Sequence, residues 1–332
     1  MQNLKKGPGS NFDKSSLAPF LIGLLAASSV AAQQFPTKPV RIIVPFSPGS
    51  ILDVVSRFAA GKSSEAWGQP VVVENRGGAG GRIGSEQVAK SAPDGHTLLM
   101  GSSGTHVGAV FLSKNLPYDP VKDFTPITLA VEPVSALIVN PAVPANNTRE
   151  LVDYLKKNPG KFSYASNGVG SVFHLTGELF KQTAGVDLIH VPLQGAGDIL
   201  NSVVGGHIPV GFGSMASLPP HIAKGTVRVL GMLTVARNAR FSDIPTLTEG
   251  VPAFEAPGSW LGFFGPANLA PALLTRINAE FVKALNAPDV RPKLEDGGMV
   301  VVASSPQQFA EAIKKGFDTY GRAVKIAGIK PE

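Results

Sequence analysis

Apolar residues recur along the chain in one repeated order: a short β-branched run, a glycine-rich turn and a longer amphipathic segment. Residues 40–46 have the continuous apolar character of a buried strand, and the turn 47–50 leads into a helical pattern over 51–67. Similar runs predict strands at 71–74, 96–101, 162–165, 188–191, 208–212 and 227–232. Because helical pattern separates these runs, the sequence predicts an α/β fold with mainly parallel sheets flanked by helices.

Two apolar stretches are placed where the chain would pass between two sheets. The stretch 124–140 is β-rich and too long for one strand, which is typical of a strand that leaves one sheet and enters another. The stretch 253–266, with its aromatic residues, has the composition of a return crossing. Crossings near 133 and 256 predict one lobe from 33–133 plus 256–332 and a second lobe from 134–255.

The first 32 residues have the order of a secretory signal peptide. Lysines precede an apolar stretch over 17–30, and Val30-Ala31-Ala32 supplies the small-residue cleavage pattern. A membrane anchor is the alternative, but the stretch is shorter than the ~20 apolar residues that a span needs. We therefore expect the segment 1–32 to be removed and the protein to act in the periplasm.

Composition excludes several kinds of chemistry. The chain has 332 residues, a formal net charge of +6 and no cysteine, so disulfides, thiolate catalysis and cysteine-based zinc sites are excluded. No run of basic residues predicts nucleic-acid binding. The six histidines are never three to five residues apart, so no helical pair predicts a metal site. We expect no metal and no cofactor, and the glycine-rich turn before Ile83 lacks the dinucleotide fingerprint.

Small-residue loops between a strand and a helix are the strongest functional candidates. One is the loop 47–53, and another is the loop 166–171. Such loops leave backbone N–H groups unpaired at a helix N-terminus, where the helix dipole favours an anion. The alternative is that Ser50 and Ser171 only cap their helices. One loop in each predicted lobe favours a carboxylate held across a cleft.

Two further features have both a functional and a structural interpretation. The loop 192–198 contains Gln194 and two glycines that permit close backbone approach, although an ordinary strand-to-helix connection would look the same. Trp260 is either a wall of the site or a buried aromatic at the return crossing. No Gly-x-Ser-x-Gly elbow is present, and a Ser–His–Asp site stays open as an alternative.

Long stretches of the chain resemble one known family. They are VRIIVPFSPGSILDVVSR, VVVENRGGAGGRIGSEQVAKSAPDGHTLL, SYASNGVGSVFHLTGELFK, HVPLQGAGDIL and GGHIPVGF. In this order they resemble the successive blocks of the Bug-type periplasmic solute receptors, the substrate-binding components of tripartite tricarboxylate transporters. The resemblance implies a two-lobed Venus-flytrap fold, here a monomer without catalysis, that captures a small organic carboxylate and delivers it to membrane permease subunits. A receptor that signals to a membrane sensor, or an enzyme acting on a carboxylated metabolite, is the alternative.

The resemblance also implies a set of ligand-binding residues, to which we add Trp260. They are Ser47, Pro48, Gly49, Ser50, Asp53, Ser102, Ser103, Thr105, Ser166, Asn167, Gly168, Ser171, Gln194, Gly195 and Asp198. Three positions depart from the family pattern: Ser50 replaces a glycine, Leu193 replaces a common aromatic and Asn201 replaces a common aspartate. The loops 47–52 and 166–171 contain no basic residue, so we expect loop N–H groups rather than arginine to hold the carboxylate.

Overall fold

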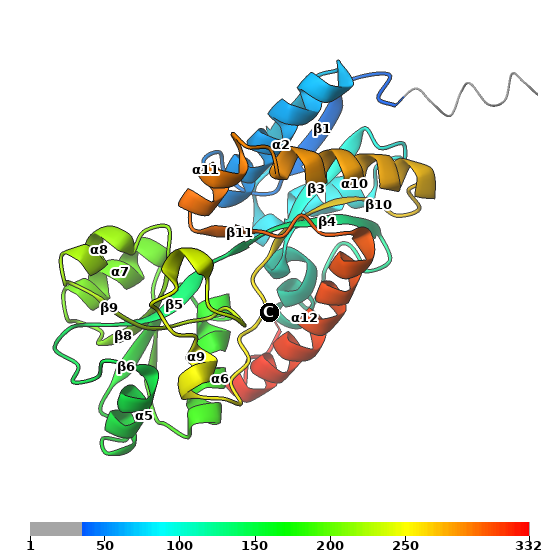
Figure 1. The fold of residues 1–332 in the computed structure, drawn as a ribbon. Coiled ribbons are helices and arrows are strands. Elements are labelled where there is room, and N and C mark those ends of the chain that lie inside the picture. Colours follow the sequence, from blue (N-terminus) through cyan, green and yellow to red (C-terminus); the bar gives the residue numbers. More distant parts are fainter. Residues whose placement is uncertain (1–34, 332) are drawn as a thin grey trace, which may run out of the picture. The chain divides into compact units, whose positions relative to one another are not determined.

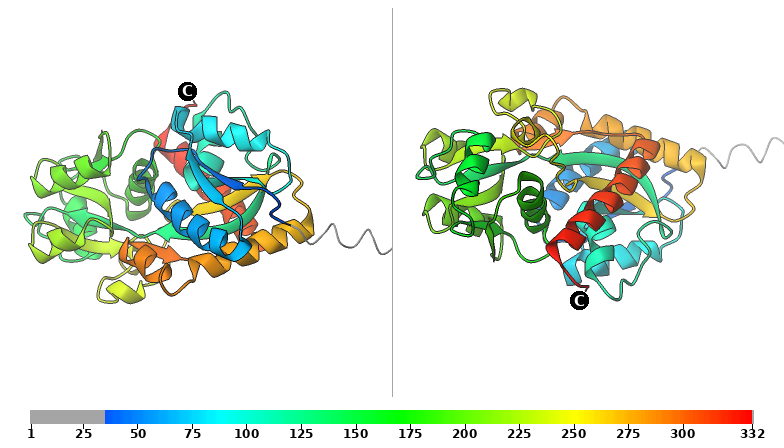
Figure 2. Two further views of the ribbon diagram at one scale, coloured as in Figure 1. Left: turned by 90° about the horizontal axis from the view of Figure 1, so that it is seen from above. Right: turned by 90° about the horizontal axis from the view of Figure 1, so that it is seen from below.

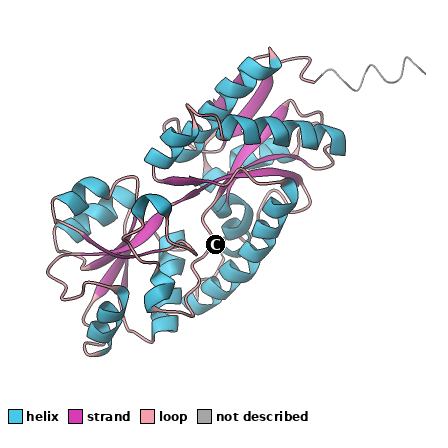
Figure 3. Cartoon of the chain, viewed as in Figure 1, coloured by secondary structure: helices cyan, strands magenta, loops and turns pink. Residues whose placement is uncertain are grey.

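The computed structural model describes residues 35–331, so the predicted signal segment 1–32 lies outside the described residues. The chain from Lys38 onward forms one compact unit that holds all of the elements below. Its strands gather into two separate sheets, each covered by helices (Figures 1 and 3). Within the described part of the chain, no helix is long and apolar enough to cross a membrane.

The first sheet has six strands in the order β11-β4-β10-β3-β1-β2. Its strands are β1 (Val40–Val44), β2 (Val71–Asn75), β3 (Thr97–Ser102), β4 (Phe124–Pro133), β10 (Leu261–Pro266) and β11 (Met299–Val301). β1 pairs in parallel with β2 and β3, whereas β10 runs antiparallel between β3 and β4. β11 also runs antiparallel to β4. Most strands therefore share one direction, as predicted, but the reversed strand β10 in the interior makes the sheet mixed.

The second sheet has five strands in the order β7-β6-β8-β5-β9. Its strands are β5 (Ser135–Val139), β6 (Ser163–Ser166), β7 (Ile189–Pro192), β8 (Val210–Ser214) and β9 (Arg228–Met232). β6 pairs in parallel with β7 and β8, and β5 runs antiparallel between β8 and β9. This sheet is mixed for the same reason: its one reversed strand is an interior strand that arrives from the other sheet.

The long apolar stretch 124–140 is two strands in two sheets, as its pattern predicts. β4 and β5 are separated only by Val134, whose backbone donates to Gly298 O and accepts from Met215 N, each at 2.9 Å. The chain returns through residues 256–260 into β10. β5 is buried along its whole length and β4 over residues 127–131, because each is an interior strand of a sheet that helices cover.

Helices cover both faces of the first sheet (Figure 2). They are α2 (Ile51–Trp67), α3 (Arg82–Ala89), α4 (Ala109–Leu112), α10 (Pro271–Leu285), α11 (Arg291–Asp296) and α12 (Pro306–Ala327), with short turns at η3 (Ala79–Gly81) and η4 (Gly104–Gly108). Around the second sheet are α5 (Thr148–Lys156), α6 (Val172–Ala184), α7 (Ala196–Val204), α8 (Pro219–Ala223), α9 (Leu247–Gly250) and η5 (Ala239–Phe241). The predicted helix 51–67 matches α2 at both ends.

Helix α12 joins the elements of both sheets. It starts with a capping box between Ser305 and Gln308, and it packs against β4 of the first sheet and α6 of the second. Tyr320 on this helix donates hydrogen bonds to Ser103 Oγ at 3.2 Å and to Gly258 O at 3.4 Å. Glu255 in the return segment forms ion pairs with α12 as well. The return crossing is therefore tied to α12 along its length.

Candidate functional site

The loop after β1 is organised by a buried carboxylate. Asp53, only 3% exposed, accepts from Gly49 N at 2.9 Å and from Asn75 Nδ2 at 2.9 Å. Arg57 donates to it from Nε and Nη2, both at 2.9 Å. Burial alone would raise the pKa of Asp53, but these hydrogen bonds outweigh it and hold the pKa below its usual value.

This arrangement changes the role that we predicted for Asp53. A carboxylate offers about four acceptor positions, and all of them are used within the protein, so Asp53 shapes the loop 47–50. Ser50 caps α2 by accepting from Asp53 N at 3.3 Å. The N–H groups of Ile51 and Leu52 have no acceptor among the described residues, because the first turn of a helix has no preceding carbonyl groups to receive them. Ser47, Pro48 and Gly49, which precede them in the loop, are exposed.

The strand-end loop 102–105 follows β3, next to β1 in the same sheet. Ser102 is half-buried and exchanges hydrogen bonds with Thr105, including Ser102 N to Thr105 Oγ1 at 3.0 Å. Thr105 is 1% exposed and its hydroxyl contacts His106 Nδ1 at 2.9 Å. Ser103 is equally buried against Tyr320. Ser102 is thus the accessible hydroxyl of this predicted group, and the other two support the loop from behind.

The loop after β6 is the most elaborately supported. Ser171 caps α6, accepting from His174 N at 3.2 Å and donating to Gly168 O at 2.7 Å. Ser166 is fully buried and bonds Gly168 on both its backbone N and O. Asn167 is exposed, and Gly168 has φ of +110°, a conformation that side-chain-bearing residues rarely adopt. Of the first-turn N–H groups of α6, His174 N is used by this cap, whereas those of Val172 and Phe173 have no acceptor among the described residues.

The loop after β7 lies beside it. Because β6 and β7 are parallel neighbours, their carboxyl ends adjoin, and Leu193 N donates to Ser166 O at 2.9 Å. Helix α7 begins after Gly195 with no side-chain cap, so the N–H groups of Ala196, Gly197 and Asp198 are left without recorded acceptors. Gln194 and Asp198 are exposed. Two helix N-termini therefore open next to each other, and a single anion can be bonded by both.

A cavity of about 340 Å³ lies next to these loops on the side of the first sheet. It is lined by Ala79, Gly80, Arg82, Gly104, Ala109, Leu112 and Ser113. Leu112 borders the cavity and also the loop 166–171, since a Cβ at Gly170 would lie 3.0 Å from Leu112 Cδ2. Sequence reasoning missed this cavity, because it interpreted the glycine run before Ile83 only as a tight turn.

Arginine is present at the cavity but already engaged. Arg82 donates to Ala79 O and to Ser113 Oγ, each at 2.8 Å, which ties the turn 79–81 to the end of α4. Arg57 is bound to Asp53, and Arg76 pairs with Glu74 at 3.4 Å. None of the three belongs to the loops 47–52 or 166–171. Of the three, only Arg82 lines the cavity, so the expectation that no arginine holds the carboxylate is tested mainly at Arg82.

Trp260 is a buried residue rather than an exposed wall. It is 3% exposed and packs edge-on against Phe309, with ring centroids 5.0 Å apart. Its backbone oxygen accepts from Ser103 N at 3.1 Å. Trp260 is thus placed as a buried aromatic at the return crossing, where its backbone supports the loop 102–105.

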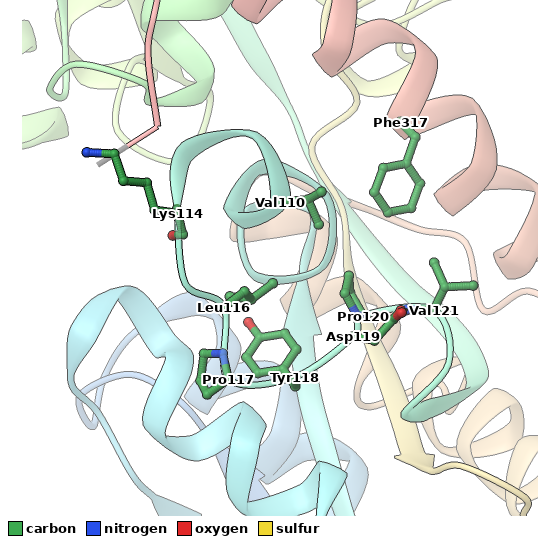
Figure 4. Close-up of a pocket in the computed structure, with 10 residues that line it drawn as sticks. Val110, Lys114, Leu116, Pro117, Tyr118, Asp119, Pro120, Val121 and Phe317 are labelled. Carbon is green, nitrogen blue, oxygen red and sulfur yellow. The ribbon is translucent and has the colours of Figure 1, made fainter.

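A larger cavity of about 580 Å³ lies between α4, the segment 113–121 and α12. Figure 4 shows Val110 and Phe317 on one side of it and Leu116, Tyr118 and Pro120 on another. Its lining is part apolar and part polar, with Ser113, Lys114 and Asp119 among its residues, and it contains none of the predicted loops. Its size would favour it as the ligand site, but the helix N-termini with unpaired backbone N–H groups lie at the other loops.

No group of acidic residues and histidines in the described part of the chain could hold a metal.

Two α/β sheets joined by two crossings, with glycine-rich loops at strand ends, define the class of two-lobed solute-binding proteins. The model of the tripartite tricarboxylate transporter family receptor matches residues 55–329. Protein BugT of Bordetella pertussis is 32% identical over 92% of this chain and 94% of that protein.

Solved structures agree with this assignment. R. palustris Rpa4515 with adipate is 30% identical, with a TM-score of 0.75 over 90% of this chain and 100% of that one. MatC (Rpa3494) from Rhodopseudomonas palustris with bound malate is 32% identical, with a TM-score of 0.70 over 87% of this chain and 100% of that one. The chain belongs to the tripartite tricarboxylate transporter receptor family, whose members are periplasmic solute-binding proteins, and the resemblance seen in the sequence is confirmed.

Proposed function

We propose that this receptor binds a small organic carboxylate with its loop backbones and delivers it unchanged to membrane permease subunits. The observation that carries the proposal is the pair of adjoining helix N-termini: Val172 N and Phe173 N of α6, and the first-turn N–H groups of the uncapped α7, lack acceptors among the described residues. A carboxylate placed there accepts charge-assisted hydrogen bonds and interacts favourably with both helix dipoles. Relatives solved with adipate and with malate support a dicarboxylate as the ligand.

The two sheets correspond in this proposal to two lobes that close on the ligand. We assign residues 33–133 plus 256–332 to one lobe and 134–255 to the other. The loops 166–171 and 194–198 then supply the carboxylate site from the second lobe, while the loop 47–50, Ser102 and the cavity beside Arg82 receive the rest of the ligand from the first. X-ray scattering should show a smaller radius of gyration when ligand is bound, because a ligand that contacts both lobes favours the closed state.

Calorimetry with matched ligands tests the proposal. Malate, adipate and citrate are compared with their neutral amides, which keep the shape of each ligand and remove its charge. We expect at least one acid to bind and its amide to bind at least ~10-fold more weakly, since each charge-assisted hydrogen bond is worth ~1.5–3 kcal/mol. Equal affinity for acid and amide would contradict a carboxylate site.

Recovery of the ligand distinguishes a receptor from an enzyme. Prolonged incubation followed by mass spectrometry should return the ligand unchanged, whereas a new product would favour the enzyme alternative.

Export is tested in the same preparation: we propose that periplasmic protein begins close to Gln33, and its intact mass should show this. A full-length chain retained in the cytoplasm would contradict the localisation.

A further inference from the structure

Two histidines lie directly beneath the loop 166–171. His174 is in the first turn of α6 and His190 is in β7, and their rings stack with centroids 3.8 Å apart and an interplanar angle of 9°. His174 is 6% exposed. We propose that this pair positions the carboxylate-binding loop only while His174 is neutral, so that acid loosens the loop and releases the ligand. The effect on affinity rests on the proposed function, whereas the effect on the loop does not.

The contact of His174 depends on its charge. Gly170 N donates to His174 Nδ1 at 3.0 Å, so Nδ1 must offer a lone pair and the ring proton must be on Nε2. Protonation would place an N–H on Nδ1 directly opposite the N–H of Gly170. The hydrogen bond would then be lost, and Gly170, which is buried and has φ of +77°, would lose the contact that fixes its otherwise permissive backbone.

The contact of His190 is compatible with either charge. Its Nε2 lies 2.7 Å from Ser166 Oγ, and the serine hydroxyl can donate to the ring or turn toward Gly168 O at 3.1 Å. A protonated His190 would donate to the hydroxyl, which keeps this link. The importance of His190 is its stacking on His174: a charge on one ring makes a charge on the other more costly.

The groups around the pair keep both rings neutral near pH 7. Burial lowers the pKa of His174 in spite of Glu178, which raises it, and Lys181 lowers it further. Burial, followed by the neighbouring His174, lowers the pKa of His190 to about 4. Tyr164 on β6 has its pKa raised by burial and by Glu178, so it stays protonated and donates to Glu178 Oε1 at 2.8 Å. Within the described residues, no charged group of α12 shifts the pKa of either histidine.

The sign of the pH effect follows from these directions. A histidine whose pKa is lower in the ordered loop than in the free side chain takes up protons when the loop opens. The ordered loop is therefore fully favoured above the ordinary histidine pKa of about 6.5, and it loses stability as the pH falls toward the pKa values of the buried pair.

Nuclear magnetic resonance on ligand-free, ¹⁵N-labelled protein tests the loop directly. At pH 7 we expect the Nδ1 of His174 to be unprotonated, and we expect the Gly170 amide signal to shift as the pH is lowered from 7 and His174 becomes protonated. Titration of His174 with no change at Gly170 would overturn the proposal, whether or not any ligand has been found.

Matched variants test the consequence for binding, with malate and adipate as probes. In His174→Asn the side-chain oxygen replaces Nδ1 as acceptor without titrating, so affinity at pH 7 should stay within ~3-fold and the additional loss at about pH 5 should disappear. His174→Leu removes the acceptor and should weaken binding by about 10-fold at both pH values. His221→Asn, on α8, is the control and should behave as wild type.

Comparison with His174→Asn at each pH corrects for protonation of the ligand, whose carboxyl groups begin to titrate in the same range. The proposal is wrong if His174→Leu binds like wild type, or if His174→Asn keeps the wild-type pH profile. It is equally wrong if acid strengthens binding in wild type relative to His174→Asn, because a protonated pair would then act as an attractive charge rather than as a lost support.

Discussion

Replacing Ala196 with proline removes one backbone N–H from the start of α7 while leaving the helix intact. Ala196 is the first residue of the helix, where proline is well tolerated because its missing N–H would have no partner inside the helix. Gly195 before it is extended, with φ of −170° and ψ of 176°, which suits a residue preceding proline. The chain itself begins α10 and α12 with Pro271 and Pro306.

The expected magnitude follows from the hydrogen bond that is lost. A hydrogen bond to a charged group contributes ~1.5–3 kcal/mol, and each 1.4 kcal/mol is a factor of about ten in affinity. If the ligand carboxylate accepts from Ala196 N, Ala196→Pro should weaken binding by about 10- to 100-fold. The melting temperature of the ligand-free protein should change little, because this side chain is exposed and the N–H has no partner in the protein.

Calorimetry on three proteins tests whether the ligand carboxylate accepts a hydrogen bond from Ala196 N. Wild type, Ala196→Pro and Ala196→Gly are titrated with the same carboxylate, and the glycine variant serves as the control because it loses the methyl group but keeps the N–H. We expect Ala196→Gly to stay within ~3-fold of wild type. A proline variant that folds and also binds within ~3-fold would refute the use of the α7 N-terminus by the ligand.

Four other substitutions probe the supports of the site. Gly177→Ala should destabilise the protein by ~1–3 kcal/mol or more in chemical denaturation, because a Cβ would lie 2.1 Å from the buried Tyr164 ring; a change below ~0.5 kcal/mol would contradict this packing. Arg57→Ala should change carboxylate affinity by less than ~3-fold, whereas Asp53→Ala, which frees Gly49 N, should weaken it by about 10-fold; the reverse order would mean that the arginine meets the ligand. Arg82→Met should also stay within ~3-fold in calorimetry, and a loss above ~10-fold would show that the ligand has an anionic end in the cavity.

The hydrophobic periodicity of the sequence predicted helices and strands well, but it did not predict the direction of each strand relative to its neighbours in the sheet. Helix α2 matches its predicted bounds, since apolar spacing and the cap at Ser50 are local signals. The mixed character of the sheets was not predictable from alternation alone, because strand direction depends on where the crossings enter. β10 and β5 are interior strands that run against their neighbours, and both belong to the segments that connect the two sheets.

The candidate site was predictable where it depends on loops and unpredictable where it depends on distant partners. Helix N-termini follow from small residues after a strand, and the structure shows them after β1, β6 and β7. Nothing local indicates that Asn75 reaches Asp53, or that Trp260 is buried under Phe309. The stacking of His174 on His190 arises because β7 runs beside the strand that precedes α6.

If backbone N–H groups hold the carboxylate as proposed, side chains elsewhere in the site must select among different acids. A backbone N–H is the same group in every sequence, so the N-termini of α6 and α7 can distinguish an anion from a neutral molecule but cannot sense the length or shape of the ligand. That discrimination requires side chains, and the ones available here are Leu193 beside the loop 166–171 and Leu112 at the cavity of about 340 Å³. Solved relatives hold adipate and malate on this fold. A change of ligand is therefore expected to come from substitutions at these side chains, while substitutions that remove helix N-terminal donors weaken every carboxylate alike.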